Sequence, residues 1–298
     1  MMRRYEIGAR IGGEFEIEDR RISEAGEIYF TRNVQDQQKW LLKTRSASQT
    51  LWREQIAYWL QAPLHAHLLA VGLQVEQHDG LLFMLLPMIQ NEAGQHDLGE
   101  WLQDDVLTLP TVLKITLQIA SGLNALHEAG MVHGNIKPGH ILLRREGNIT
   151  LTDFCLPDQV TVDASNAPYL APETSRDIRS DIYALGSLLY QMLTGKSAFV
   201  GSTPSEIRTA HQSSTHESLS DDFPAALVSL FDRCLQLDPM QRYQTPAELL
   251  DDLAHIYTVS VGDMPSEVAP PQIPPLQIHW SRGQAYMALQ QTEKAIEN

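Results

Sequence analysis

The stretch that decides the fold runs from residue 133 to residue 143 and reads His133-Gly134-Asn135-Ile136-Lys137-Pro138-Gly139-His140-Ile141-Leu142-Leu143. Other short motifs stand before and after it in one order: Lys43, Glu54, Asp153-Phe154-Cys155, Ala171-Pro172-Glu173, Asp181, Gly186 and Arg242. Each piece alone is a weak signal, because a lysine at the end of a strand is usually a solvated edge residue. The whole series, in this order and with these spacings, is far more specific than any one piece.

Residues 1–89 consist mainly of short runs that predict β-strands. Apolar runs at 27–30 and 40–42, separated by the polar residues 33–39, predict a hairpin. We also expect strands over 68–75 and 81–88 and a helix over 51–60. The longest apolar run, 81–89, is about half of the ~20 residues that cross a bilayer, so it predicts a buried strand instead.

The rest of the chain, after about residue 98, changes to helical patterns. Apolar residues at mostly three- and four-residue steps predict a helix over 111–129 that stops at Gly130. Further helices are expected over 185–193, 225–237 and 246–256. A small strand-rich part followed by a larger helix-rich part predicts an α+β arrangement of two lobes.

The ordered motifs resemble those of the eukaryotic-like serine/threonine protein kinase family, from about residue 15 to residue 258. The resemblance implies a two-lobed protein-kinase-like fold. Its small β-rich N-lobe is expected over 1–89 and its large helical C-lobe over 90–258.

The resemblance also implies roles for single residues. Lys43 matches the strand lysine that holds the α- and β-phosphates of ATP, Glu54 its ion-pair partner, and Asp153 the aspartate that binds Mg²⁺. Lys137 resembles the catalytic-loop lysine that steadies the γ-phosphate. The implied cofactors are ATP with Mg²⁺ or Mn²⁺. The implied nucleotide-binding residues are Gly26, Ile28, Leu41, Lys43, Glu54, Leu86 (the gatekeeper position), Pro87, Ile89, Leu142 and Asp153.

A second group of residues matches the structural framework of the family. Tyr58, Phe154 and His133 fall where the family stacks an internal hydrophobic spine, which rests on Asp181. Asp181 also matches the helix aspartate that braces the catalytic loop. Glu173 and Arg242 resemble the structural ion pair of the large lobe.

Two departures from the family pattern fall at the centre of the chemistry. Asn135 stands at the catalytic aspartate, and its amide cannot accept the proton of a substrate hydroxyl as a carboxylate does. His140 stands at the asparagine that binds the second metal ion, and imidazole is a poorer Mg²⁺ ligand than an amide oxygen. Because loss of a positioned base costs about 10²–10⁴ in rate, the sequence predicts impaired catalysis.

The phosphate-covering loop departs from the pattern as well. The family's Gly-x-Gly-x-x-Gly-x-Val falls on residues 21–28, where only Gly26 keeps a glycine, so the backbone closes less tightly over phosphates. Leu41 stands where the family has a small alanine beside adenine. Cys155 replaces the glycine after Asp-Phe. Gly134 replaces the arginine that reads a phosphorylated activation loop, so we expect no regulation of that kind.

Three functions remain open at this point. The first is a pseudokinase that acts as a regulatory or scaffolding protein-binding module and retains weak nucleotide binding. The second is a slow serine/threonine kinase, since phosphoryl transfer relies largely on positioning and electrostatics. The third is a scaffold that binds no nucleotide, because Leu41 and the altered glycine loop close the pocket.

Composition narrows the class of partner. The 298 residues carry a net charge of −15, which disfavours nucleic acid and anionic membrane surfaces. The chain has two cysteines and no apolar stretch after its basic start, so we expect a cytoplasmic protein without a disulfide framework. Protein partners are expected on the kinase-like surface and on the C-terminal region.

The C-terminal region breaks the kinase pattern. Five prolines within 259–278 predict a stiff linker. Residues 279–298 match spacings of a tetratricopeptide repeat, with Gly283, Tyr286 and Ala295 in place. A partial repeat cannot bury its own apolar face, so we expect the natural chain to continue into more repeats, the alternative being a lone amphipathic helix.

Overall fold

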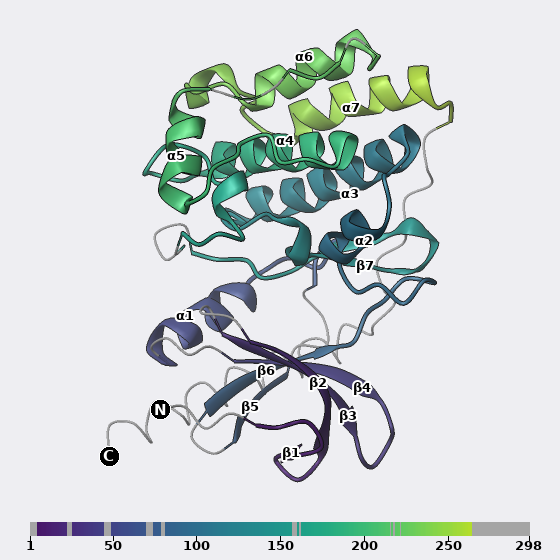
Figure 1. The fold of residues 1–298 in the computed structure, drawn as a ribbon, viewed down its shortest axis with the longest axis vertical. Helices are drawn as coiled ribbons and strands as arrows, with labels where there is room; N and C mark the ends of the chain where they lie inside the picture. The colour runs from purple at the N-terminus through teal and green to yellow at the C-terminus, as the bar shows by residue number, and fades with distance from the viewer. Residues whose placement is uncertain are drawn as a thin grey trace. The chain divides into compact units, whose positions relative to one another are not determined.

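A computed structural model describes residues 5–22, 26–44, 49–69, 74–78, 81–156, 160, 162–214, 216, 218–220 and 222–263 (Figure 1). These residues divide into two compact units. The first unit holds the described residues up to Gln61 and those from 74 to Ile89. The second holds Ala62–Leu69 and the described residues from Gln90 onward.

The first unit is an antiparallel sheet with the strand order β1-β2-β3-β4-β6-β5. Its strands are β1 (Arg10–Ile11), β2 (Phe15–Ile22), β3 (Glu27–Asn33), β4 (Lys39–Thr44), β5 (Gln74–His78) and β6 (Leu81–Pro87). The predicted hairpin is confirmed, because β3 pairs with β4 and the Asn33 N–H donates to the Gln38 carbonyl across the turn at 2.8 Å. The predicted buried strand is β6, whose residues 81–86 are all buried.

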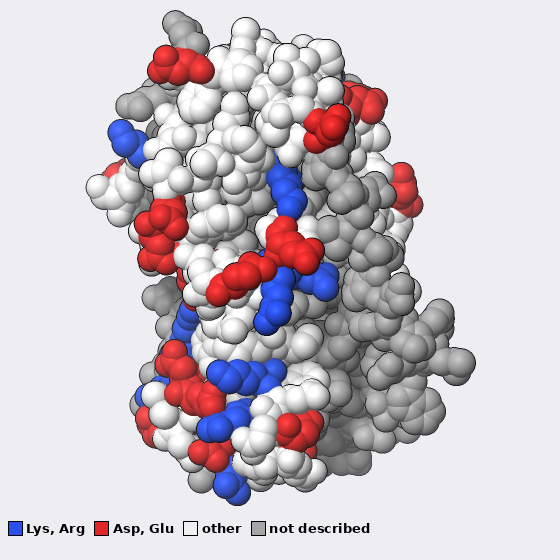
Figure 2. Space-filling view, turned by 90° about the vertical axis from the view of Figure 1, so that its right-hand side faces the viewer, with Lys and Arg blue, Asp and Glu red and all other residues white. Residues whose placement is uncertain are grey.

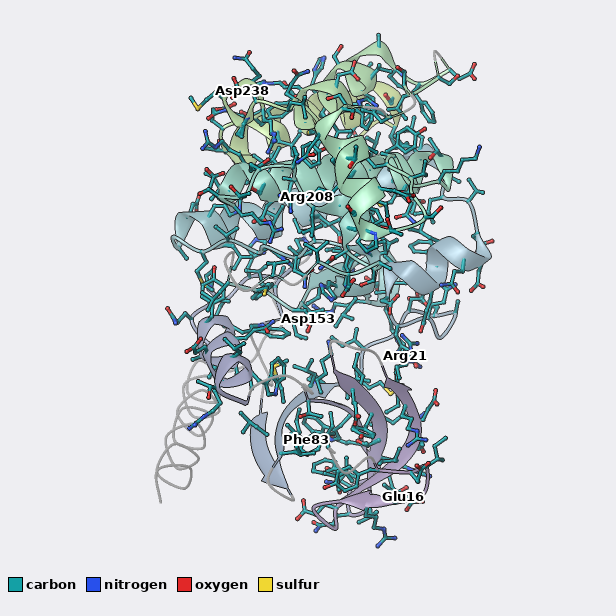
Figure 3. All side chains as sticks on the ribbon, turned by 60° about the vertical axis from the view of Figure 1, so that its left-hand side comes forward. Glu16, Arg21, Phe83, Asp153, Arg208 and Asp238 are labelled. Atoms are coloured by element: carbon teal, nitrogen blue, oxygen red, sulfur yellow. The ribbon has the colours of Figure 1, made fainter. Side chains whose placement is uncertain are left out.

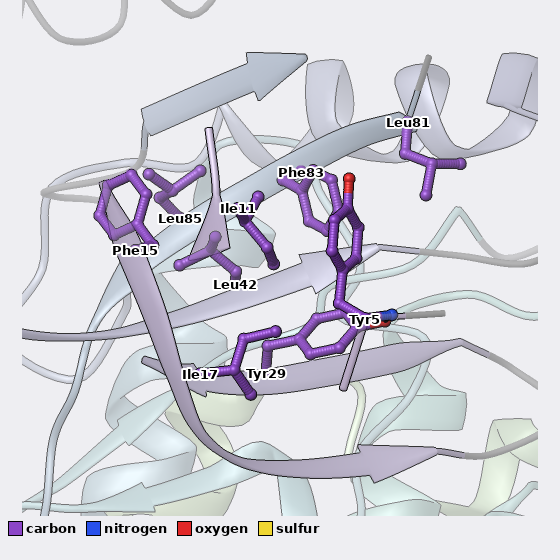
Figure 4. Packing of buried hydrophobic residues seen from close by; sticks show 9 residues of the cluster. All are labelled: Tyr5, Ile11, Phe15, Ile17, Tyr29, Leu42, Leu81, Phe83 and Leu85. Atoms are coloured by element: carbon purple, nitrogen blue, oxygen red, sulfur yellow. The ribbon is translucent and has the colours of Figure 1, made fainter. Parts of the chain in front are cut away.

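The core of the first unit lies on one face of this sheet (Figure 4). Alternate residues of a strand point to opposite faces, so the pairing of neighbouring strands decides which side chains meet. The cluster consists of Tyr5, Ile11, Phe15, Ile17, Tyr29, Leu42, Leu81, Phe83 and Leu85. The rings of Tyr5, Tyr29 and Phe83 pack edge-on or tilted at centroid distances of 5.9–6.2 Å.

Helix α1 (Gln49–Trp59) packs on β6 in the same unit. Trp52 is buried, and its indole N–H donates to the carbonyl of Leu82 at 3.1 Å. Because a buried indole N–H needs an acceptor, this bond fixes the helix against the strand as well as filling space. The predicted helix over 51–60 is therefore present, two residues longer at its start.

The second unit is built mainly from helices. They are α2 (Leu98–Asp104), α3 (Leu109–Glu128), α4 (Ile178–Thr194), α5 (Pro204–Gln212), α6 (Ala225–Cys234) and α7 (Pro246–Ser260). Helix α3 packs against both α4 and α7, and α6 against α4 and α7 (Figure 1). A short hairpin of β7 (Ile141–Leu143) and β8 (Ile149–Leu151) follows the catalytic-loop stretch. Among the residues that the structure describes, no helix is both long and apolar enough to span a membrane.

Several predicted bounds differ from the structure. The strand expected over 68–75 overlaps β5 only at Gln74 and Val75. Leu68 forms a parallel bridge with Leu151 and the Leu69 N–H donates to the Leu151 carbonyl at 2.9 Å, so these two residues belong to the second unit. Helix α4 begins before 185, because Asp177 and Ser180 form a capping box at its start. Helix α6 ends before 237, and α2 and α5 were not predicted.

The predicted C-terminal segments lie largely outside the described residues. Helix α7 includes Val259 and Ser260, so the first two residues assigned to the proline linker are helical. The rest of that linker from residue 264 and the tetratricopeptide-like stretch 279–298 are not described.

Charge on one face of the described residues is mixed (Figure 2). On the face shown in Figure 2, acidic and basic side chains are interspersed, and neither sign forms one continuous patch. The net charge of −15 is therefore not concentrated on this face.

Candidate functional site

The second face of the first unit's sheet carries four of the ten predicted nucleotide-binding side chains: Ile28, Leu41, Lys43 and Leu86. The register places Ile28, Lys43 and Met84 in one row across three strands and Phe30, Leu41 and Leu86 in the next. These residues alternate with those of the core cluster, so they point away from it. Lys43 is buried despite its charge.

Phe30 is a residue of this face that sequence reasoning missed. Its ring lies under the guanidinium of Arg21, 4.9 Å from the ring centroid. Arg21 stands where the family pattern has its first glycine, so a long cation occupies this position (Figure 3 labels Arg21). The run Ile28-Tyr29-Phe30 is apolar throughout, so only the strand register, which pairs Phe30 with Leu41, identifies it. Both are buried, and together they fill the row that ends in Leu86.

The remaining first-unit predictions fall at the edges of the sheet. Pro87 and Ile89 are half-buried, and the neighbouring Met88 N–H donates to the Lys39 carbonyl at 3.2 Å. Gly26 is half-buried at the start of β3, and residues 23–25 before it lie outside the described part of the chain.

Helix α1 carries Glu54, the predicted ion-pair partner of Lys43. Glu54 is exposed, whereas its neighbour Gln55 is only 2% exposed. One step along a helix turns a side chain by about 100°, so the motif's spacing did not decide which of the two faces inward. Tyr58, the predicted first-unit member of the spine, is half-buried on the same helix.

In the second unit, the buried carboxylate of Asp181 braces the catalytic-loop stretch. Its two oxygens accept the backbone N–H groups of His133 and Gly134, each at 2.8 Å. The Nε2 of His127 lies 2.9 Å from the same carboxylate. Three donors on one buried carboxylate hold the backbone before Asn135 in one conformation.

The spine residues of the second unit pack together as well. The rings of His133 and Phe154 meet edge to face with their centroids 5.1 Å apart. Burial, opposed by the charges of Asp181 and Asp153, lowers the pKa of His133. The His133 ring is therefore neutral at neutral pH and packs against the ring of Phe154. Its carbonyl also accepts the Cys155 N–H at 2.8 Å.

Gly134 shows why the arginine of the family pattern is absent. Its φ is +71°, and a Cβ on this residue would lie 2.5 Å from the Cys155 carbonyl oxygen. Only glycine fits both the left-handed backbone and this close approach. An arginine here would require the segment after Phe154 to move.

Asn135 follows this braced segment. It is 7% exposed, its N–H donates to His133 Nδ1 at 3.3 Å, and its carbonyl accepts His140 Nδ1–H at 2.8 Å. Among the described residues, its side-chain Oδ1 has no hydrogen-bond partner. An amide oxygen thus occupies the base position with its backbone held on both sides.

His140 and Asp153 face each other, with His140 Nε2 lying 4.0 Å from Asp153 Oδ2. Because Nδ1 donates to Asn135, a neutral His140 turns the lone pair of Nε2 toward the carboxylate. An imidazole nitrogen and a carboxylate oxygen are both able to act as ligands of a cation. Asp153 adopts the left-handed backbone (φ +62°), which costs about 1 kcal/mol or more in a non-glycine residue.

These two residues fit a divalent cation in part. A carboxylate oxygen and an imidazole nitrogen suit Mn²⁺ better than Mg²⁺, which prefers oxygen. No group of three or more His, Cys, Asp or Glu side chains that could hold a metal occurs among the described residues. Asp153 and His140 would therefore share the cation with ligands from a nucleotide.

Lys137 reaches the segment that follows Asp153. Its Nζ donates to Ser165 Oγ at 2.7 Å, and Ser165 donates in turn to Asp163 at 2.6 Å. Burial raises the pKa of Asp163, but the bonds from Ser165 and the charge of Lys137 outweigh it and lower that pKa. Asn166 accepts the Asp163 N–H at 2.9 Å, so a hydrogen bond between its two ends holds the turn 163–166. Leu142, the last predicted contact, is buried on β7 opposite Thr150.

Comparison with known proteins agrees with this arrangement. Residues 24–253 match the model of the protein kinase domain. The chain belongs to the protein kinase domain family. Members of this family use ATP with Mg²⁺ or Mn²⁺.

Curated relatives of this kinase domain are bacterial serine/threonine-protein kinases. A probable member from Clostridium perfringens is 28% identical over 212 residues, which are 66% of this chain and 30% of that protein. One from Clostridium acetobutylicum is 34% identical over 167 residues, 51% of this chain and 25% of that protein. The chain thus spans less than a third of the length of these relatives.

A solved structure shares the fold. The PknI kinase domain of Mycobacterium tuberculosis superposes with a TM-score of 0.64 at 22% identity, over 85% of this chain and 99% of that one. This supports a kinase fold with a β-sheet N-lobe and a helical C-lobe.

The kinase domain's large unit also contains the Glu173–Arg242 pair. Arg242 donates to both carboxylate oxygens of Glu173, at 2.7 and 2.9 Å, and Ser180 Oγ donates to the same carboxylate at 2.7 Å. Burial raises the pKa of Glu173, but the bonds from Arg242 and Ser180 lower it below its usual range. The remaining Arg242 donors go to the carbonyls of Gln236, Arg179 and Leu237.

The stability of this kinase domain should depend on pH through His211. His211 Nε2–H donates to the Ala167 carbonyl at 3.0 Å, and Nδ1 accepts the hydroxyl of Tyr183 at 2.7 Å. Burial lowers its pKa from 6.5 to about 4. In the unfolded chain the imidazole of residue 211 is protonated below about pH 6.5, whereas in the folded chain it stays neutral until about pH 4. The contribution of this group therefore lowers the free energy of unfolding by about 3 kcal/mol between pH 6.5 and pH 4.

Chemical denaturation at pH 7 and pH 4.5 measures this effect. His211→Gln should flatten the pH dependence, whereas His255→Gln, at an exposed position on α7, should leave it as in the wild type. Equal acid sensitivity in all three proteins would show that His211 does not cause it.

Proposed function

We propose that this kinase domain is a catalytically impaired module that binds nucleotide weakly and regulates or scaffolds protein partners. The observation that carries the proposal is Asn135. Asp181 holds the backbone just before it, and His140 holds its carbonyl, so the amide occupies the base position in a well-determined place. An amide there cannot accept the substrate proton.

The nucleotide anchors support the binding half of the proposal. Lys43 shares one sheet face with Ile28 and Leu41, and Asp153 is held in a left-handed conformation facing His140. These residues correspond to the family's phosphate and metal contacts, which remain even though the base is absent.

A slow serine/threonine kinase is the second candidate. Lys137 and Asp153 keep the residue types that stabilise the transferred phosphoryl group, and the curated relatives are named serine/threonine-protein kinases. Since phosphoryl transfer depends mainly on positioning and electrostatics, these residues support some turnover without a base.

A nucleotide titration followed by thermal unfolding tests the binding half. ATP with Mn²⁺ should stabilise the protein by ~2.7 kcal/mol at 100 times its Kd, more than ATP with Mg²⁺ at equal concentrations. Lys43→Ala should abolish the effect. Lys39→Ala, an exposed lysine on the same strand, should retain it.

An assay with radiolabelled ATP on the same samples tests the proposal that catalysis is impaired. We expect little transfer to generic protein substrates or to the chain itself. Robust transfer that Lys43→Ala removes would establish the slow-kinase alternative. No stabilisation by any nucleotide or metal would instead establish a nucleotide-free scaffold, in which Phe30 and Leu41 fill the sheet face.

A further inference from the structure

The turn of residues 163–166 supplies Lys137 with a partner from within the chain. Lys137 Nζ donates to Ser165 Oγ at 2.7 Å, and the Ser165 hydroxyl donates to Asp163 Oδ1 at 2.6 Å. One hydroxyl therefore connects an ammonium group to a carboxylate. Each of the two hydrogen bonds involves a charged group, and such bonds are shorter and stronger than bonds between neutral groups.

The turn holds the carboxylate of Asp163 in place. Asp163 Oδ1 also accepts the backbone N–H groups of Ser165 and Asn166, at 2.7 and 3.0 Å. Asn166 is buried, and its carbonyl accepts the Tyr169 N–H at 2.9 Å. These bonds fix the geometry with which Asp163 and Ser165 face Lys137.

Asp163 is negatively charged at neutral pH. Burial raises its pKa, but the bonds from Ser165 and the charge of Lys137 outweigh burial and lower that pKa. A carboxylate therefore lies one hydroxyl away from the ammonium of Lys137. Its charge weakens the attraction between this ammonium and any other anion that approaches it.

Lys137 differs from Lys43 in the phosphate that it meets in the proposed nucleotide site. The proposal assigns the terminal γ-phosphate to Lys137 and the α- and β-phosphates to Lys43. A γ-phosphate has to compete with Ser165 and Asp163 for the ammonium of Lys137. The α- and β-phosphates, which a nucleoside diphosphate also carries, do not meet this competition.

We propose that Asp163, acting through Ser165 on Lys137, makes this domain bind a nucleoside diphosphate at least as tightly as the corresponding triphosphate. The inference rests on the proposed function, since it names the class of nucleotide that the proposed site prefers. Asp163 is a positioning residue in this role, because it acts through Lys137. Ser165 is exposed and Lys137 is half-buried, so water screens these charges and the effect of Asp163 is several-fold.

Calorimetric titration of the full chain with ADP and with ATP, each with Mn²⁺, tests the proposal. The wild type should bind ADP as tightly as ATP or more tightly. Asp163→Asn should strengthen ATP binding at least about threefold and leave ADP binding unchanged, because it removes the charge that offsets Lys137. Asparagine keeps an Oδ1 that accepts the N–H groups of Ser165 and Asn166, so the unfolding temperature without nucleotide should stay that of the wild type.

Two further variants show whether the effect passes through Lys137. Adding Lys137→Met to Asp163→Asn should remove the gain in ATP affinity, because the released ammonium is the group that the γ-phosphate binds. Asp251→Asn makes the same change in charge at an exposed position on α7 and should leave the binding of both nucleotides as in the wild type.

Four results would overturn this inference while leaving nucleotide binding intact. Tighter binding of ATP than of ADP by the wild type would show that Lys137 is available to a terminal phosphate. Unchanged ATP binding in Asp163→Asn would show that Asp163 does not oppose it. An equal gain for both nucleotides would show a general effect of charge. A gain that persists with Lys137→Met would show that Asp163 does not act through Lys137.

Failure of the proposed function gives a different result. If neither ADP nor ATP binds to the wild type or to any variant, the binding half of the proposed function is wrong and this inference is wrong with it.

Discussion

Asn135→Asp should raise the rate of phosphoryl transfer to a protein hydroxyl by about 10²-fold or more, because a positioned base contributes about 10²–10⁴. The exchange of an amide for a carboxylate hardly changes the size of the side chain. The backbone around residue 135 is already held by Asp181 and His140, so the new carboxylate should occupy the place of the amide.

The hydrogen bonding of the Asn135 side chain is compatible with this exchange. The Oδ1 of Asn135 has no hydrogen-bond partner among the described residues, so the substitution breaks no bond of that atom. Initial rates with radiolabelled ATP and Mn²⁺ measure the gain.

Two controls accompany this measurement. Asn33→Asp makes the same change in charge at an exposed turn and should leave the rate unchanged, since Asn33 acts there as an acceptor for the N–H groups of the next residues. Adding Lys137→Met to Asn135→Asp should remove the gain. A rate that Asn135→Asp does not raise would show that the missing base is not what limits catalysis in this domain.

Arg242→Ala should destabilise the second unit by about 3–5 kcal/mol, the largest effect on stability that we expect from one substitution. Arg242 is only 1% exposed and makes two bonds to Glu173 and three to backbone carbonyls. Its loss leaves the Glu173 carboxylate without its cation and the carbonyls without donors.

Denaturant unfolding at pH 7 measures this loss. Arg233→Ala is the matched control, because Arg233 forms an exposed ion pair with Glu248 and stacks on Tyr243, which together contribute roughly 1 kcal/mol. The double variant Glu173→Ala with Arg242→Ala should cost less than the sum of the two single variants. A cost for Arg242→Ala no larger than that for Arg233→Ala would contradict a structural role for the pair.

The Glu173–Arg242 ion pair also predicts the direction in which the free energy of unfolding changes with pH. The pKa of Glu173 is lowered in the folded state, so its contribution is present above pH 4.5 and is lost as the pH falls through the folded pKa. Arg242→Ala should remove this part of the acid sensitivity.

Much of the fold and the placement of several motifs could be predicted from local pattern. Apolar runs at 27–30 and 81–89 predicted strands, and the structure has β3 and β6 at these places. Apolar residues at three- and four-residue steps predicted α3 and α7, because such residues lie on one face of a helix. The departure at Asn135 was also visible, since it is a change of residue type within an ordered motif.

Other features needed contacts between segments that are distant in the sequence. Leu68 and Leu69 begin a stretch predicted as a strand of the first unit, but their pairing with Leu151 assigns them to the second. Whether Glu54 or Gln55 faces inward depends on how α1 packs on β6. No pattern within the helix decides it.

The sequence by itself determined the family, the order of the motifs and the presence of an asparagine at position 135, because these depend on residue type and spacing along the chain. Only the tertiary structure decided two further points: that Cys155 leaves room for nothing but glycine at 134, and that His140 lies beside Asp153. The physical reason is that clashes, charge repulsion and burial depend on distances through space. Residues far apart in the chain acquire such distances only when it folds.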